Sequence, residues 1–310
     1  MGIKHNYQSG TANDATDEVS STRWNEDHVI SDFLEFPQIA DPAVPAAGKL
    51  RLYAKNVAGK LLAKIIGPSG IDTVLQPSFG GNSIYTMSPA NNAIAPTVVG
   101  GTLTTGTTIS HVQTIASANA FQATRRTRFT SAATAAAVTG ARTVYPQWFL
   151  GNAAGFGGFF FRAQFGMGIN LNGGQKFVGL CASTTALAGD PSALVNMIGM
   201  GYDAADLSTG NWFLMRNDGV GVATKVNLGV GAARNINDGY DLILHAKPNS
   251  AEIFVRVVNL QTNAVVLDTS YTTDIPVVNV GMALKVEARN GAVAAADGVD
   301  IAKAYIESDY

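Results

Sequence analysis

The chain from residue 121 to its end is a succession of short runs in which apolar residues are β-branched or aromatic, or alternate with polar ones. Runs of about four to eight such residues, bounded by Asn-, Gly- and Pro-rich clusters, are typical of β-strands joined by turns. Asn217-Asp-Gly219 is a strong hairpin signal, because Asn and Gly tolerate positive φ. The predicted strands are 158–165, 176–182, 194–202, 211–216, 222–228, 240–246, 251–259, 264–271, 280–289 and 298–307. About ten strands without a long amphipathic helix predict an all-β fold, an antiparallel β-sandwich of the jelly-roll type.

A separate hairpin precedes this region. In KLRLYAK (49–55) Leu50 and Leu52 alternate with charged residues, and KLLAKII (60–66) is the expected return strand. Two strands alone bury too little apolar surface to be stable, so the hairpin must pack on a neighbour, such as the same hairpin in sister chains. We therefore divide the chain into an extended N-terminal segment (1–41), a hairpin neck (42–77), a linker with short strands (78–120) and a sandwich head (121–310).

The N-terminal segment differs in composition from the rest, with eight acidic residues against two basic ones in residues 1–41. Its stretch 8–22 is too polar to bury a core. Spaced aromatic residues interrupt it, at Tyr7, Trp24, Phe33 and Phe36. This pattern is typical of a segment that orders on a partner, and an unstructured terminus is the alternative. Trp24, isolated among polar residues, is the side chain we expect to be buried in a partner groove.

Charge and cysteine content narrow the function classes. The net charge is −2, which argues against a protein that binds nucleic acid along its length. No apolar run reaches the roughly 18 residues of a membrane helix, so no membrane insertion is predicted. One cysteine, Cys181, and four scattered histidines predict neither a disulfide nor a metal centre, and no cofactor motif is present. Only 14% of residues are charged, so the strand edges have few of the charged side chains that prevent unwanted strand pairing. We therefore expect sister chains to cover these edges.

Several motifs are similar to those of tailed-phage fibre and appendage proteins. The opening KHNYQSG…STRWNEDHVI resembles their N-terminal pattern, with a W-N-x-D-H motif formed here by Trp24, Asn25, Asp27 and His28. The runs RLYAK, GKL and GIDTVLQP look like the same group. The last third resembles a module of tail-fibre-like proteins through FFFRAQFG, FVGLCAST, GDPSALVNMIGMGYDAAD, NWFLMRNDGVGVATKVNLG, YDLILHAKPNS and IAKAYIESDY. The resemblance covers residues 1–77 and 155–310.

This resemblance implies a virion structural protein that is assembled in the bacterial host cytoplasm. It implies a homotrimer attached to other virion proteins through its N-terminus, with a distal lectin-like head that binds host cell-surface carbohydrate. The residues expected to dock on the virion are Tyr7, Trp24, Asn25, Asp27, His28, Phe33 and Phe36. A capsid or tail decoration protein with a purely structural role is the alternative interpretation.

A polysaccharide-degrading tail spike is the enzymatic alternative. Glycoside hydrolysis generally needs two carboxylates, and residues 73–189 contain neither aspartate nor glutamate. The remaining candidates, Asp203, Asp206, Glu287, Asp297 and Asp300, lie near turns and strand ends, where carboxylates usually bond to amides. No G-x-S-x-G motif occurs near His111 or His245. The sequence therefore predicts no catalytic residue.

Sugar binding needs exposed aromatic faces and polar side chains beside them. The aromatic candidates are Trp148, Tyr202 and Trp212, with Asp206 and Asn211 as polar neighbours. A core position is the alternative for Trp212, because it alternates with Leu214.

Three arginines lie together in the strand-like run ATRRTRFTS, at positions 125, 126 and 128. Alternation places Arg126 and Arg128 on one face. A solvated strand face or an inter-chain contact is the favoured interpretation, and phosphate binding is the alternative.

Overall fold

The computed structural model describes residues 36–57, 60–70, 72–75, 83–90, 95–105, 108–153 and 155–308. The chain divides after Pro37 into two units, and the second, Gln38–Tyr310, holds all the elements that follow. None of the helices in these described ranges has the length and hydrophobicity that a membrane crossing requires.

A small antiparallel sheet corresponds to the predicted neck. It contains β1 (Arg51–Val57), β2 (Lys60–Ile66) and β3 (Asp72–Val74), and β1 pairs with β2 along its full length. The predicted hairpin is thus confirmed, with a short third strand added. Tyr53 lies on the buried side of β1, whereas Leu50 and Leu52 are 72% and 44% exposed. The alternating leucines therefore face solvent in the single chain.

The larger of the two remaining sheets has nine strands. Its main path runs β17-β16-β15-β10-β19-β4-β5, and β8 and β7 continue from the first half of β19. These strands are β4 (Ser83–Ser88), β5 (Thr97–Val99), β7 (Thr108–Val112), β8 (Arg126–Thr130), β10 (Phe159–Ile169), β15 (Gly239–Ala246), β16 (Ile253–Asn259), β17 (Val265–Tyr271) and β19 (Gly298–Ser308). The long strand β19 therefore links two groups of strands within one sheet.

The second sheet has seven strands in the order β14-β13-β12-β11-β18-β9-β6. They are β6 (Leu103–Thr105), β9 (Val138–Thr143), β11 (Gln175–Cys181), β12 (Met197–Tyr202), β13 (Phe213–Asn217), β14 (Thr224–Asn227) and β18 (Ala283–Arg289). One short α-helix, α2 (Ala120–Ala123), and 3₁₀ turns at Pro191–Ala193, Ala204–Thr209 and Gly229–Ala232 complete the described elements.

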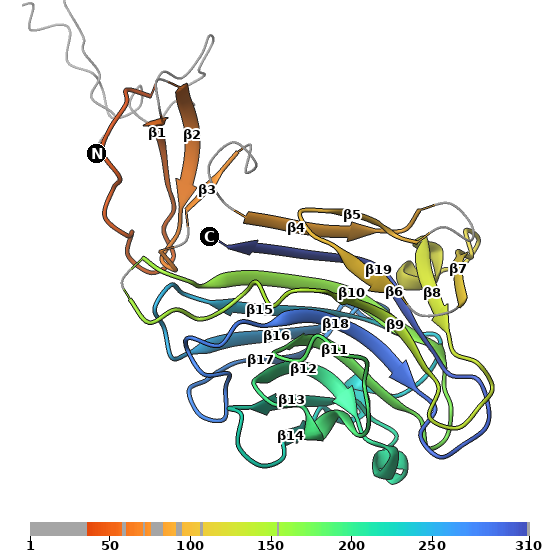
Figure 1. Ribbon diagram of the computed structural model, residues 1–310. Coiled ribbons are helices and arrows are strands. Elements are labelled where there is room, and N and C mark those ends of the chain that lie inside the picture. The colour runs from red at the N-terminus through yellow and green to blue at the C-terminus, as the bar shows by residue number, and fades with distance from the viewer. Residues whose placement is uncertain are drawn as a thin grey trace, which may run out of the picture. The chain divides into compact units, whose positions relative to one another are not determined.

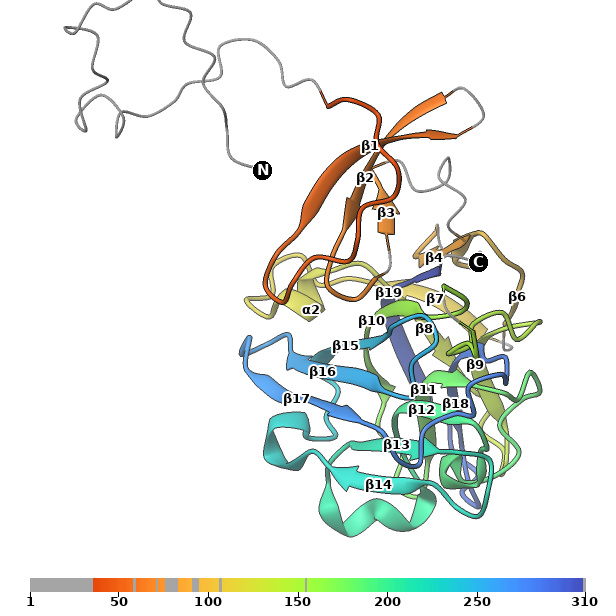
Figure 2. The same ribbon diagram turned by 90° about the vertical axis from the view of Figure 1, so that its left-hand side faces the viewer.

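The two sheets form the layers of a sandwich, as Figure 1 shows and as the turned view in Figure 2 repeats. Every pairing between the named strands is antiparallel, which confirms the predicted fold class. Side chains from both sheets make one continuous hydrophobic core. Within it the Trp212 ring lies 5.4 Å from that of Phe165 and 5.1 Å from that of Tyr202, both edge to face. Such contacts tie the nine-stranded sheet to the seven-stranded one.

All ten strands predicted for the head are present, with bounds shifted by a few residues. The stretch 78–120, expected to be a linker with short strands, supplies β4, β5 and β7 to the nine-stranded sheet and β6 to the other. Tyr85 and Met87 of β4 are both 1% exposed and belong to the core cluster. The sandwich thus includes strands that lie before residue 121.

Candidate functional site

The outer face of the nine-stranded sheet carries aromatic, charged and amide side chains, several of them partly exposed. Along β10, buried Phe159, Phe161 and Phe165 face the core. Because side chains alternate along a strand, the residues between them point outward. Phe160, Arg162 and Gln164 lie between the buried phenylalanines, and Gly166 and Gly168 continue the same side of the strand.

Four aromatic rings form a line across this face, and we call them the aromatic row: Tyr305 of β19, Phe160 of β10, His245 of β15 and Phe254 of β16. Phe160 pairs directly with His245, and His245 pairs directly with Phe254. The Phe160 ring centroid is 6.3 Å from that of Tyr305 and 6.5 Å from that of His245. The rings of His245 and Phe254 are stacked at 5.9 Å. The row is partly exposed, and Phe254 is 37% accessible.

Polar side chains lie beside the aromatic row, further along the same strands. Arg162 donates from Nε and Nη2 to both carboxylate oxygens of Asp241, at 2.5–3.0 Å. Hydrogen bonding to Asp241 raises the pKa of Arg162 above its ordinary value. Gln164 donates to the same carboxylate at 3.4 Å, and the exposed Lys303 pairs across the strand with Gln164. The face therefore offers donors and acceptors next to flat apolar rings.

Helix α2 packs on the same outer face through a gap left by two glycines. Gly166 and Gly239 are direct cross-strand partners, and the Phe121 ring lies against both. A Cβ added at Gly239 would lie 2.1 Å from Phe121 Cγ. Asn119 caps the helix with its side-chain oxygen and donates from its amide to the carbonyl of Asn237. The glycine pair thus fixes the position of the helix.

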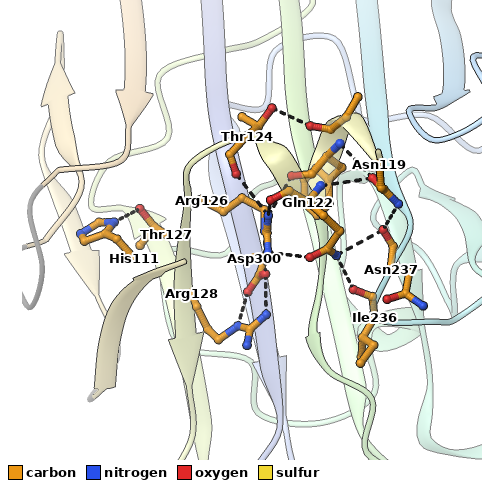
Figure 3. A network of polar contacts seen from close by, with 12 residues as sticks. His111, Asn119, Gln122, Thr124, Arg126, Thr127, Arg128, Ile236, Asn237 and Asp300 are labelled. Carbon is orange, nitrogen blue, oxygen red and sulfur yellow. Dashed lines mark hydrogen bonds and ion pairs between the residues drawn. The ribbon is translucent and has the colours of Figure 1, made fainter. Parts of the chain in front are cut away.

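A hollow of about 540 Å³ opens beside α2, and we call it the arginine pocket. Figure 3 shows the polar contacts around its two arginines. Its lining includes His111, Gln113, Gln122, Arg126, Arg128 and Asn237. These residues come from β7 and the residue after it, α2, β8 and the segment before β15. The lining contains no carboxylate.

Arg126 and Arg128 both bind Asp300 of β19, whose side chain is only 1% exposed. Arg126 is itself 2% exposed and also donates to the carbonyls of Phe121, Gln122 and Thr124. Arg128 binds Asp300 through Nε at 2.8 Å and Nη2 at 2.9 Å and keeps 27% of its side chain exposed. The prediction of a solvated strand face is therefore wrong for Arg126, which serves as a buried ion-pair partner.

The aromatic residues predicted to stack on sugars lie in the core. Trp148 is 2% exposed, and Tyr202 and Trp212 are fully buried. Trp148 packs edge to face on Tyr85 at 5.6 Å. Burial raises the pKa of Tyr202 well above its usual value. Since stacking needs an exposed face, the prediction that these three residues bind sugar is wrong, and they are core residues. For Trp212 this confirms the alternative drawn from its alternation with Leu214.

The polar candidates near them have structural partners. Asp206 accepts hydrogen bonds from Lys225 Nζ at 2.7 and 2.8 Å and from the Asp203 amide in a capping box. Asn211 donates to the side-chain oxygen of Asn227 at 3.1 Å. The structure thus brings Tyr202 and Trp212 into contact, but as part of the packed interior. Of the predicted virion-docking residues, Phe36 is described and is 44% exposed, while Tyr7, Trp24, Asn25, Asp27, His28 and Phe33 lie outside the described residues.

The carboxylates considered for catalysis are held by cations. Asp203 and Asp206 share Lys225. The remaining pairs are Glu287 with Arg142 and Lys285, Asp297 with Lys176, and Asp300 with the two arginines. In the described part of the chain no group of three or more His, Cys, Asp or Glu side chains gathers as metal ligands would.

No protein-family model and no curated protein matches the sequence. Among solved structures the chain is similar to peanut lectin, with 9% identity, a TM-score of 0.42 and coverage of 73% of this chain and 97% of that one. It is similar to the carbohydrate recognition domain of Emp47p at 14% identity and TM-score 0.46, covering 72% and 94%. It is also similar to alginate lyase A1-II' at 10% identity and TM-score 0.40, covering 73% and 95%. These values assign no function to the chain.

Sequence reasoning missed the aromatic row. Part of its signal is local, because Phe160, Arg162 and Gln164 alternate with core residues in GFFFRAQF. The rest depends on strand pairing, which brings His245 and Phe254 next to Phe160 from other parts of the chain.

Proposed function

We propose that this protein is a non-enzymatic glycan-binding protein of a phage virion, and that it binds carbohydrate on the outer face of the nine-stranded sheet. The observation that carries the proposal is the aromatic row beside the Arg162–Asp241 ion pair. Sugar rings present apolar C–H faces that pack on aromatic rings, while their hydroxyls need paired donors and acceptors nearby.

The shape of the row suits a chain of sugars. It crosses four adjacent strands, β19, β10, β15 and β16. With strands about 4.8 Å apart, it spans about 14 Å, which is longer than one pyranose ring. The Lys247 ammonium, 5.5 Å from the Phe254 ring, adds a donor at one end. An oligosaccharide laid across the strands would contact several rings of the row and the polar side chains of Arg162, Asp241 and Gln164 beside them.

The virion role rests on the resemblance to phage fibre and appendage proteins. In this role the N-terminal segment docks on other virion proteins and the head binds host cell-surface carbohydrate. The homotrimer is supported by exposed apolar side chains on the neck, where Leu50, Leu52 and Leu75 are 72%, 44% and 59% accessible. Sister necks packed together would cover them, and three heads would gain avidity from weak single sites.

The test is binding of the purified chain to host surface polysaccharide, measured by titration calorimetry. Replacing Phe160→Ala and Phe254→Ala together removes two rings, which at about 0.5–1.5 kcal/mol each weakens binding by roughly five- to 150-fold. Tyr145→Ala is the matched control, because Tyr145 is 65% exposed and lies outside the row. Equal affinity of the double variant and the control would refute the proposed site.

Two further measurements separate the other functions. A decoration protein with a purely structural role predicts no glycan binding by the wild-type chain. A degrading spike predicts new reducing ends when the glycan is incubated with the protein. Light scattering that gives the mass of a single chain would overturn the trimer.

A further inference from the structure

The arginine pocket has the dimensions and chemistry of a binding site for one small polar group. Its volume of about 540 Å³ lies within the usual range of roughly 300–1,000 Å³ for ligand sites. Amide side chains of Gln113 and Asn237 line it, and their NH₂ and C=O groups match sugar hydroxyls, whereas the Gln122 NH₂ already donates to the carbonyls of Ile236 and Asn237. Figure 3 shows Gln122 and Asn237 beside the two arginines and Asp300.

Charge is unbalanced at this pocket. Two guanidinium groups share the one carboxylate of Asp300, which leaves a net positive charge of about one. Arg126 is buried and engaged through all three of its nitrogens. Arg128 engages Nε and Nη2, and its Nη1 makes no hydrogen bond to any residue in the described ranges. The excess charge is therefore presented by Arg128, which lines the hollow.

The position of Arg128 is fixed by a built feature of the sheet. The β10–β19 register shifts between Met167 and Ile169, so Gly168 lies at a β-bulge. A Cβ at Gly168 would lie 2.6 Å from Asp300 Oδ1 and 3.0 Å from Arg128 Nε. Only glycine leaves room for the ion pair here, and the bidentate contact holds the guanidinium ready for a ligand.

We infer that the arginine pocket binds the carboxylate of an acidic sugar, with Arg128 as its charge partner and the surrounding amides holding hydroxyls. This inference rests on the proposed function and narrows it to acidic glycans. One net positive charge balances a monoanionic carboxylate, whereas a phosphate would retain excess negative charge. Gly168 and Phe160 are eight residues apart on β10, about 26 Å, and Asp300 and Tyr305 are five residues apart on β19, about 17 Å, so the pocket is a separate subsite from the aromatic row.

The full chain is titrated with D-glucuronate, D-galacturonate and N-acetylneuraminate, and binding of each sugar is measured by saturation-transfer NMR. D-glucose and inorganic phosphate are the comparison ligands. At least one carboxylated sugar should bind more tightly than D-glucose and phosphate, and Arg128→Gln should weaken it about tenfold or more. Arg125→Gln is the matched control, because Arg125 does not line the pocket, is exposed and donates to the Ala90 carbonyl.

Arg128→Gln should fold, because Asp300 keeps Arg126 as its partner. The inference is overturned if no carboxylated sugar binds, if glucose or phosphate binds as tightly, or if Arg128→Gln and Arg125→Gln bind alike. The double variant Phe160→Ala/Phe254→Ala separates the two sites. If it still binds host polysaccharide normally while Arg128→Gln loses carboxylated sugars, the pocket stands and the aromatic row fails. The converse pattern rejects the pocket and leaves the row.

Discussion

The ion pair between Lys176 and Asp297 lies inside the sandwich, and its removal tests how the core tolerates charge. Both side chains are fully buried, and Lys176 Nζ donates to Asp297 Oδ1. Lys176 comes from β11 of one sheet, and Asp297 directly precedes β19 of the other. Burial lowers the pKa of Lys176 and raises the pKa of Asp297, since the interior solvates neither charge well.

Replacing Lys176→Met leaves the Asp297 carboxylate with its bond from the Gly298 amide, at 2.8 Å, and without an ion-pair partner among the described residues. An uncompensated buried charge costs about 3–5 kcal/mol, which corresponds to a melting temperature lower by roughly 6–15 °C. The double variant Lys176→Met/Asp297→Leu removes both charges. Because apolar replacements of buried pairs are often neutral, it should recover most of the loss.

Urea unfolding followed by tryptophan fluorescence measures this cycle. Trp212 is a good reporter, since its ring packs on Tyr202 at 5.1 Å and the Lys176 ammonium lies 5.5 Å from the same tyrosine. The coupling energy is the departure of the double variant from the sum of Lys176→Met and Asp297→Leu. If Lys176→Met is as stable as wild type, or the two single effects simply add, the pair does not stabilise the core as described.

Three further predictions follow from the same outer face and core. Gly239→Ala places a Cβ 2.1 Å from Phe121 and should cost about 1–3 kcal/mol in urea unfolding, whereas Gly189→Ala, with open space around it, should cost little. NMR titration should give His245 a pKa below its ordinary value, because burial and the charge of Lys247 disfavour the protonated imidazole. The unfolded chain therefore binds more protons than the folded chain, so the free energy of unfolding falls as the pH drops below about 6.5. His245→Gln should remove this pH dependence. Burial raises the pKa of Cys181 to about 11, so a thiol reagent at pH 8 should react slowly with the folded chain and quickly in urea. A His245 pKa at or above its ordinary value, or rapid labelling of folded Cys181, would contradict these two.

Strands were predictable because their signal is local. The run at 158–165 alternates, and β10 buries Phe159 and Phe161 while its intervening residues point outward. The alternation of Trp212 with Leu214 indicates a core position as the alternative to sugar binding, and the structure confirms that alternative. Alternation does not predict that a strand is buried on both of its faces, as Tyr202 shows. Its strand, β12, is buried on both faces, so a residue that local sequence leaves undecided becomes inaccessible.

The arginine pocket was only half visible in the sequence. Three arginines in one run are conspicuous, but their partner Asp300 is 172 residues beyond Arg128. The pairing of β8 with β19 places Arg128 directly opposite Asp300 and turns a basic run into an ordered ion-pair cluster. Gly168 adds the necessary space from a third strand. Such a site depends on register and a bulge, which residue composition does not specify.

Strand β10 explains why stability and binding can be separated in this fold. Its inward side supplies Phe161 and Phe165 to the core, and its outward side supplies Phe160 to the aromatic row and Gly168 to the arginine pocket. Since the two sides alternate residue by residue, replacing an outward side chain such as Phe160 changes the proposed binding face and leaves the packed interior intact, whereas Gly166 and Gly168 have no room for a Cβ. The outward side also avoids a uniform apolar surface, because charged and amide side chains lie between the ring and the pocket. Such a mixed face remains solvated when unoccupied, as the proposed binding of an extended polar ligand requires.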